Sequence, residues 1–371
     1  ERDTYTLSGG EKQKVAIASI LAMKPKIIIL DEPTSNLDPS STVEVFEAIR
    51  SLKERTNMTV IVLEHRLNYF APLSSRLIVM DEGSIVRDGE PGEVLKEIGL
   101  LQELGVRIPF LHYEPVERTR DCDREALLSI DDLCFSYGDR KVLSNVNLKV
   151  GEGELIGLMG DNGSGKTTLM LNILGILRPS SGGVSFRGED ITGAKVSQLA
   201  KKIGIIFQNP NHQIFEKTVL KEVMLAPLNF RMDEGERREE AERLLKYHRL
   251  WGYKDNYPFG LSYGEKRRLN VASVMVYNPD IIILDEPLVG QDFRNAQDLM
   301  RSLREIADRG RSVIMITHDP DIVSMYCDRL VFLKRGGVLV DDEPGGAFLA
   351  LQEMEEKEYL PQYLGNFVGA N

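Results

Sequence analysis

A glycine-rich loop that ends in lysine and threonine carries the most specific chemistry in this sequence, with the pattern G-x-x-x-x-G-K-T at residues 160–167. The apolar segment 155–159 precedes it, and residues 168–174 have the apolar spacing of a helix. In such a context glycines let backbone N–H groups turn towards phosphate oxygens, and the helix N-terminus adds positive potential. We therefore predict a nucleoside triphosphate site, with Lys166 at the terminal phosphates and the Thr167 hydroxyl on Mg²⁺. The loop residues predicted to bind nucleotide are Asn162, Gly163, Gly165, Lys166, Thr167 and Thr168.

Two adjacent carboxylates follow an apolar run at residues 281–284. Asp285 is expected at the C-terminal edge of a buried parallel strand, where open sheets bind ligands, and it is the natural carboxylate to hold Mg²⁺. Glu286 faces differently and is placed to act as general base on a water near the γ-phosphate. His318 follows a second apolar segment, 313–316, and is predicted to position that water and contact the γ-phosphate.

Two further side chains complete the predicted nucleotide site. Gln208 comes just after the apolar segment 203–207, so its side chain is expected in the shell of Mg²⁺ and water at the same sheet edge. Tyr137 precedes the glycine-rich loop and can stack on adenine. Packing in the core is the alternative for this tyrosine.

A long internal repeat organises the chain. The segment LSGGEK at residues 7–12 recurs as LSYGEK at 261–266, and IIILDEP at 27–33 recurs at 281–287, both at an offset of 254. This predicts duplication of a whole domain. The counterpart of the glycine-rich loop would fall before Glu1, so the N-terminal region is expected to be the C-terminal part of a first domain. A genuinely shortened first domain is the alternative.

Composition excludes several classes of protein. The 371 residues carry a net charge of −11, which disfavours a nucleic-acid partner. No apolar run reaches the length of a membrane-spanning helix. The three cysteines have no metal-site or disulfide spacing and are expected to be reduced thiols of the cytosol.

Together these residues resemble the ABC ATPases, and the signature LSGGE at residues 7–11 is the decisive element. The resemblance extends over about residues 4–345. It implies an α/β fold of the P-loop NTPase type, with a RecA-like parallel core, antiparallel β and helical subdomains, and duplication. The expected organisation is residues 1–112 for part of the first domain, 113–127 for a linker, 128–350 for a complete second domain and 351–371 for a tail. Residues 233–243 are expected to form an exposed helix.

In that family two domains close head to tail, within or between chains, and each ATP lies between the glycine-rich loop of one domain and the signature of the other. The resemblance implies one composite site here, built from Tyr137, Lys166, Thr167, Gln208, Asp285, Glu286 and His318 of the second domain and Ser8, Gly9 and Gly10 of the first, with Asp38 near the interface. The opposite site would use Asp31, Glu32 and His65 with Ser262 and Gly264. Tyr263 replaces a signature glycine there, and residues 288–292 also differ from the first copy, so unequal sites are one expectation.

Residues 63–66, 88–95 and 207–215 resemble the tandem ATPase of energy-coupling-factor importers of vitamins and metals. This implies an ATPase on the cytoplasmic face of the membrane, with a transmembrane coupling subunit contacting the region after Gln208. A separate membrane subunit would select the substrate. The main rival is a soluble tandem ABC ATPase acting on ribosomes, which tends to carry basic inserts, an iron–sulfur domain or a long charged linker. A non-hydrolysing scaffold is a third reading, disfavoured by the paired Asp285 and Glu286.

Overall fold

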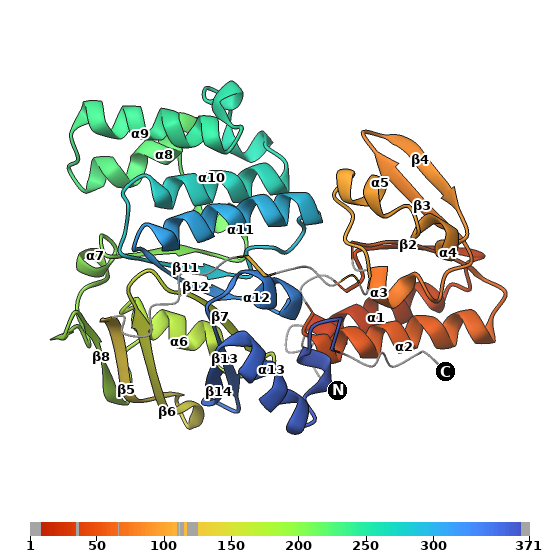
Figure 1. Ribbon diagram of the computed structural model, residues 1–371, viewed down its shortest axis with the longest axis horizontal. Coiled ribbons are helices and arrows are strands. Elements are labelled where there is room, and N and C mark those ends of the chain that lie inside the picture. Colours follow the sequence, from red (N-terminus) through yellow and green to blue (C-terminus); the bar gives the residue numbers. More distant parts are fainter. Residues whose placement is uncertain are drawn as a thin grey trace. The chain divides into compact units, whose positions relative to one another are not determined.

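In the computed structural model the chain folds into two compact units (Figure 1). The described residues are 9–34, 37–65, 67–109, 111, 115–116 and 125–364. The first unit comprises Glu1–Tyr113, Gln291–Gln297 and Lys357–Asn371. The second unit comprises Glu114–Gly290 and Asp298–Glu356. The domain boundaries predicted from the sequence stay a prediction.

The centre of the second unit is a six-stranded sheet in the order β10-β11-β12-β7-β13-β14. Its strands are β7 (Leu155–Gly160), β10 (Ile203–Ile206), β11 (Ile281–Asp285), β12 (Ser312–Ile316), β13 (Arg329–Lys334) and β14 (Gly337–Asp342). All neighbours are parallel except β13 and β14. Strands β7, β11 and β12 are buried along their whole length, as continuous apolar runs covered on both faces require. The strands predicted at 155–159, 281–284 and 313–316 are therefore confirmed.

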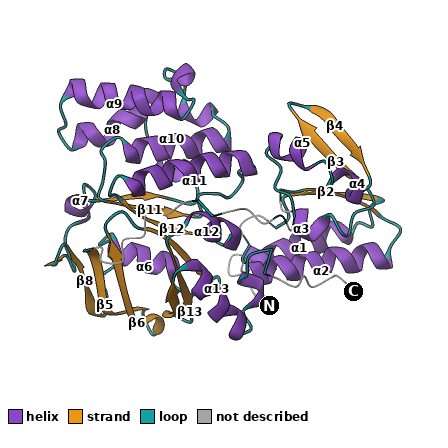
Figure 2. Cartoon of the chain, viewed as in Figure 1, coloured by secondary structure: helices purple, strands orange, loops and turns teal. Residues whose placement is uncertain are grey.

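A second, antiparallel sheet in the order β6-β5-β8-β9 packs with the central sheet around one apolar core (Figure 2). Its strands are β5 (Ala126–Tyr137), β6 (Arg140–Gly151), β8 (Ser181–Phe186) and β9 (Glu189–Asp190). Leu128, Val146 and Val150 of β5 and β6 share this core with Ile283 of β11 and Leu169 of helix α6 (Lys166–Ile173). The core therefore fixes the start of α6 against the sheet edge where ligands are expected.

Three helices, α8 (Val219–Asn229), α9 (Glu234–Tyr247) and α10 (Tyr263–Met275), form a separate helical group in the second unit (Figure 1). They pack through Val223, Leu244 and Leu269. The exposed helix expected at 233–243 is confirmed as α9, whose N-terminus is capped by the Asp233 side chain. The other helical elements after Ala126 are α7 (Val196–Leu199), η2 (Pro210–Gln213), η3 (Trp251–Tyr253), η4 (Pro258–Gly260), α11 (Phe293–Asp308), α12 (Pro320–Tyr326), α13 (Pro344–Glu353) and η5 (Lys357–Tyr359).

His248, at the C-terminal end of α9, is a buried base that makes the stability of this helical group depend on pH. Burial, with the nearby charges of Arg268 and Arg243, lowers the pKa of His248 from 6.5 to about 4. The unfolded chain therefore binds a proton at a higher pH than the folded chain does. We expect the contribution of His248 to the free energy of unfolding to be fully present above about pH 6.5. That free energy should be about 3 kcal/mol lower at pH 4.

Urea unfolding of the full chain at pH 7 and pH 4.5 tests this expectation. The variant His248→Leu should lose most of the acid sensitivity, because it keeps an apolar side chain and removes the titrating ring. His212→Gln, which changes an exposed histidine, serves as the control and should keep the acid sensitivity. An equal loss of stability on acidification in His248→Leu and in the wild type would contradict the assignment.

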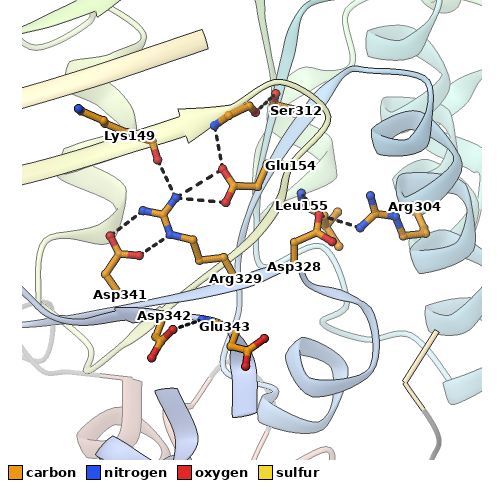
Figure 3. A network of polar contacts seen from close by, with 11 residues as sticks. Lys149, Glu154, Leu155, Arg304, Ser312, Asp328, Arg329, Asp341, Asp342 and Glu343 are labelled. Carbon is orange, nitrogen blue, oxygen red and sulfur yellow. Dashed lines mark hydrogen bonds and ion pairs between the residues drawn. The ribbon is translucent and has the colours of Figure 1, made fainter. Parts of the chain in front are cut away.

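A network of charged side chains holds the N-terminal end of the central sheet (Figure 3). Arg329 donates to both Asp341 and Glu154. Arg304 of α11, which is buried, pairs with Asp328 at 2.9 Å. Asp328 also accepts the first backbone N–H of β7 at 2.9 Å. These contacts lie at the end of β7 away from the glycine-rich loop, so they stabilise the strand that carries it.

The first unit has its own core around a parallel pair of strands, β1 and β2. Its elements are α1 (Gly9–Leu21), β1 (Ile27–Asp31), α2 (Pro39–Arg55), β2 (Thr59–Leu63), α3 (Leu67–Phe70), β3 (Leu77–Asp81), β4 (Ser84–Gly89), α4 (Pro91–Val94) and α5 (Ile98–Glu103). Ile28 and Leu30 face the core with Val45 and Phe46 of α2. Within the described residues, no helix has the length and apolar character needed to cross a membrane.

Candidate nucleotide site

The glycine-rich loop between β7 and α6 requires glycine at two positions. Gly160 has φ 140° and Gly165 has φ 107°. A Cβ on Gly160 would come within 2.0 Å of the Leu333 carbonyl oxygen, and one on Gly165 within 2.6 Å of the Leu143 side chain. Gly163 (φ 81°) has nothing within 4 Å of its Cβ position, so this side of the loop is open to a ligand.

Lys166 is the first residue of α6, and its side chain is only 7% exposed. Its ammonium donates to the carbonyl oxygens of Gly160 at 2.7 Å and Asp161 at 2.8 Å. These two hydrogen bonds hold the backbone of the loop around the lysine side chain. Among the other predicted loop residues, Asn162, Gly163 and Thr167 are exposed, while Thr168 is buried.

Asp285, at the end of β11, lies next to Thr167, with which its side chain shares a hydrogen bond. Burial raises the pKa of Asp285, whereas the positive charges of Lys166 and Arg267 and the Thr167 hydrogen bond lower it in part. A hydroxyl and a carboxylate at one sheet edge are hard oxygen donors of the kind that Mg²⁺ prefers. The structure therefore brings together three predicted residues, Lys166, Thr167 and Asp285.

Buried His318 and partly buried Glu286 form a pair at the ends of neighbouring strands. The His318 Nε2 lies 3.1 Å from the Glu286 Oε1, and the two side chains are 7% and 12% exposed. Glu286 has φ 46°, a left-handed backbone conformation that is uncommon for glutamate. Its backbone N–H still bonds the Ile316 carbonyl oxygen, so the strand pairing continues through the turn.

The first unit contains a similar but more exposed pair. The His65 Nε2 lies 3.3 Å from the Glu32 Oε1, and Glu32 also has positive φ, at 42°. The hydrogen bond with Glu32 raises the pKa of His65, while partial burial opposes the shift. Asp31 is the last residue of β1, and Asp38 is buried and caps α2 by accepting the Ser41 N–H at 2.7 Å.

The predicted aromatic and amide residues lie in different surroundings. Tyr137 is the last residue of β5 and is 50% exposed, with its ring edge-to-face on Phe135 at 4.8 Å. An exposed ring of this kind is available for stacking. Gln208 follows β10, and its carbonyl oxygen is bonded by Tyr263 and Arg267.

The two signature segments each lie at the start of a helix. Gly9 and Gly10 are the first residues of α1, and Ser8 lies outside the described residues. Ser262 is the N-cap of α10, in a capping box with Glu265, and Gly264 is in the first turn. Helix N-termini present free N–H groups, which suit a phosphate.

The sequence reading missed Arg267, which is fully buried and donates to the backbone carbonyls of Phe207, Gln208 and Glu286. The hydrogen bond of Tyr263 to Gln208 was not predicted either, because Tyr263 was considered only as the replacement of a signature glycine. One signal was available, because the first copy of the repeat has Gly9 and Gln13 at the two equivalent positions.

A parallel sheet and a glycine-rich loop that carries a lysine at the start of the next helix are the defining features of P-loop NTPases, so the protein has the fold and site of that class. Within that class, the sequence profile of the ABC transporter family matches residues 1–35 and 143–289. A provisionally named ABC transporter ATP-binding protein of Methanosarcina mazei is 35% identical, over 96% of this chain and 68% of its own length. The provisionally named HMP/thiamine import ATP-binding protein YkoD of Bacillus subtilis is 35% identical, over 94% of this chain and 68% of its own length.

Among solved structures, CbiO1 of Clostridium perfringens, which is part of the ABC transporter complex CbiONQ, has a TM-score of 0.57. It is 34% identical and covers 62% of this chain and 94% of its own. The chain spans about two thirds of the length of the curated relatives named above. It belongs to the ATP-binding proteins of ABC transporters, which are ATPases of the P-loop NTPase fold. The family and the P-loop NTPase fold predicted from the sequence are confirmed, while the predicted duplication stays a prediction.

Proposed function

We propose that this protein is the ATP-hydrolysing subunit that energises an importer of the energy-coupling-factor type, for a vitamin or a transition metal. The observation that carries the proposal is the meeting of Lys166, Thr167 and Asp285 at one sheet edge, with the pair of Glu286 and His318 just after β11 and β12 of the same sheet. The relatives support the transport assignment, since YkoD is named for HMP/thiamine import and CbiO1 for a transporter complex.

In the proposed mechanism, the loop amides and Lys166 bind the phosphates of ATP, and the exposed Tyr137 ring stacks on adenine. Thr167, Asp285 and Gln208 would hold Mg²⁺, which when bound neutralises charge on the β- and γ-phosphates. Glu286 takes a proton from the water that attacks the γ-phosphorus, so that ADP and phosphate are released. His318 holds the Glu286 carboxylate in place and contacts the γ-phosphate.

The second half of the site is proposed to come from a signature segment. Ser8, Gly9 and Gly10 would offer a hydroxyl, amides and a helix N-terminus to the γ-phosphate bound at Lys166. The opposite site would use Glu32 and His65 with Ser262 and Gly264. ATP drives closure of the domains only through the contacts it makes in the closed state, so these cross-domain contacts are the coupling.

A membrane partner is proposed to bind the region after Gln208. Phe215 is 74% exposed, and its backbone N–H and that of Glu216 donate to the buried Glu222 carboxylate of α8. A large apolar side chain held by a fixed backbone suits a protein–protein contact. The protein would thus lie at the cytoplasmic face of the membrane, while a separate membrane subunit selects the substrate.

Co-purification tests this proposal. We expect mild detergent extracts to yield the full-length protein in stoichiometric complex with a multi-helix membrane protein. Phe215→Ser should lose that partner and keep basal ATP hydrolysis. Leu349→Ser, which changes an exposed apolar residue of α13, should keep both. Recovery with ribosomes, or only in the soluble fraction, would favour the rival function in translation.

A further inference from the structure

Two of the positions at which the signature helix of the second unit differs from its first-copy counterpart lie one helical turn apart. Tyr263 and Arg267 are at the start of α10, where the repeat offset of 254 gives Gly9 and Gln13 in the first copy. Residues four apart lie on the same face of a helix, so these two side chains can act on one target. The guanidinium of Arg267 lies 5.9 Å from the centre of the Tyr263 ring.

Both side chains reach the same atom, the carbonyl oxygen of Gln208. The Tyr263 hydroxyl donates to it at 3.1 Å, and Arg267 Nη2 donates to it at 2.5 Å. Arg267 also donates to the carbonyl oxygens of Phe207 at 2.5 Å and Glu286 at 3.2 Å. One fully buried cation therefore joins the two segments that carry the Mg²⁺-shell amide and the general base of the proposed mechanism.

Two residues next to Tyr263 and Arg267, Gly290 and Glu286, have left-handed backbone conformations. Gly290 has φ 67°, and a Cβ there would lie 3.4 Å from the Tyr263 ring, so the ring runs along a glycine. Glu286 is held in a left-handed conformation at φ 46°, which is unfavourable for a residue other than glycine and persists only where surrounding contacts hold it. The Arg267 hydrogen bond to the Glu286 carbonyl is one such fixing contact.

We propose that Tyr263 and Arg267 form a clamp that positions Gln208 and Glu286 for hydrolysis and ties the first turn of α10 to the nucleotide site of its own unit. They are positioning residues, because each acts through the backbone of another residue. Gly9 and Gln13 cannot reproduce both contacts in the first copy, since glycine has no side chain and the neutral glutamine amide lacks the charge and the forked donors of a guanidinium. The clamp is thus an asymmetry between the two copies of the signature.

The test compares Tyr263→Phe and Arg267→Gln with the wild-type full chain. Tyr257→Phe is the matched control, since it removes one hydroxyl from an exposed tyrosine just before η4, in the same unit, and leaves the hydrogen bonds to Gln208 in place. Two readouts are made: hydrogen exchange of the amides near residue 208, and kcat and KM for ATP hydrolysis. The exchange readout needs no catalysis, and neither readout depends on the identity of a transport partner.

We expect Tyr263→Phe to speed exchange near residue 208 and to lower kcat by about fivefold, the usual value of one hydrogen bond, while KM for ATP stays the same. Arg267→Gln should lower kcat by about 50-fold, since charge-assisted bonds are stronger, and Arg267→Lys should restore part of it. The effects of the double variant should be less than additive, because both side chains hold one atom.

Two results would overturn the proposal. One is exchange near residue 208 that is unchanged in both Tyr263→Phe and Arg267→Gln. The other is a loss of kcat that Tyr257→Phe reproduces. If Arg267→Gln does not fold, Tyr263→Phe alone decides the matter, because its half-exposed side chain can lose a hydroxyl without creating a cavity.

Discussion

Replacing Glu286 by glutamine is expected to leave ATP bound and slow its hydrolysis by roughly 10²–10⁴-fold, the usual contribution of a general base. Glutamine has the shape of glutamate but cannot accept the proton of the attacking water. The side chain is only 12% exposed and lies 3.1 Å from His318, so bulk water is poorly placed to replace it as the base. The expectation concerns kcat, because in the proposed mechanism the carboxylate acts on the water at the γ-phosphate and contributes little to holding adenine.

Phosphate release at saturating MgATP, together with titration of a fluorescent ATP analogue, measures both parts of this prediction. Glu189→Gln makes the same change on the exposed strand β9 and should have no effect on either quantity. A decrease in turnover of less than tenfold would show that Glu286 is not the base. A loss of nucleotide binding would show that the variant disturbs the site itself.

The sequence was sufficient to predict the frame of the site. Apolar runs placed three central strands, and the glycine, lysine and threonine spacing placed the loop, because both depend on local pattern. The side chains that meet at the sheet edge followed from one rule, that parallel strands bring their C-terminal ends together. Asp285 and Thr167 meet there as that rule requires.

The contacts of Arg267 could not be predicted in the same way. They join carbonyl groups of Phe207, Gln208 and Glu286, which lie far from Arg267 along the chain and carry no side-chain signal. The left-handed backbone of Glu286 could not be predicted from its residue type either, since glycine and asparagine are the residues that usually adopt it. The long strand β5 was not placed from the sequence either, because register shifts interrupt its alternation of polar and apolar residues.

Replacing Lys166 by alanine is expected to weaken ATP binding at this site by at least about 100-fold, in the range for removing one partner of a buried charged contact. The ammonium is the positive side chain at the centre of the loop, and carbonyl oxygens of Gly160 and Asp161 hold it there. Alanine leaves the loop amides and the helix N-terminus, which bind phosphate more weakly without the charge.

Titration of the full chain with a fluorescent ATP analogue measures the Lys166→Ala affinity, and thermal unfolding shows whether the variant is folded. Lys221→Ala removes the same charge from an exposed position on α8 and should bind nucleotide normally. Near-normal affinity in Lys166→Ala would remove the basis for placing the phosphates in this loop. The two variants also separate two steps, because Glu286→Gln keeps the bound state that Lys166→Ala cannot reach. If ATP closes the domains by binding alone, Glu286→Gln should accumulate the closed form, and Lys166→Ala should stay open at every ATP concentration.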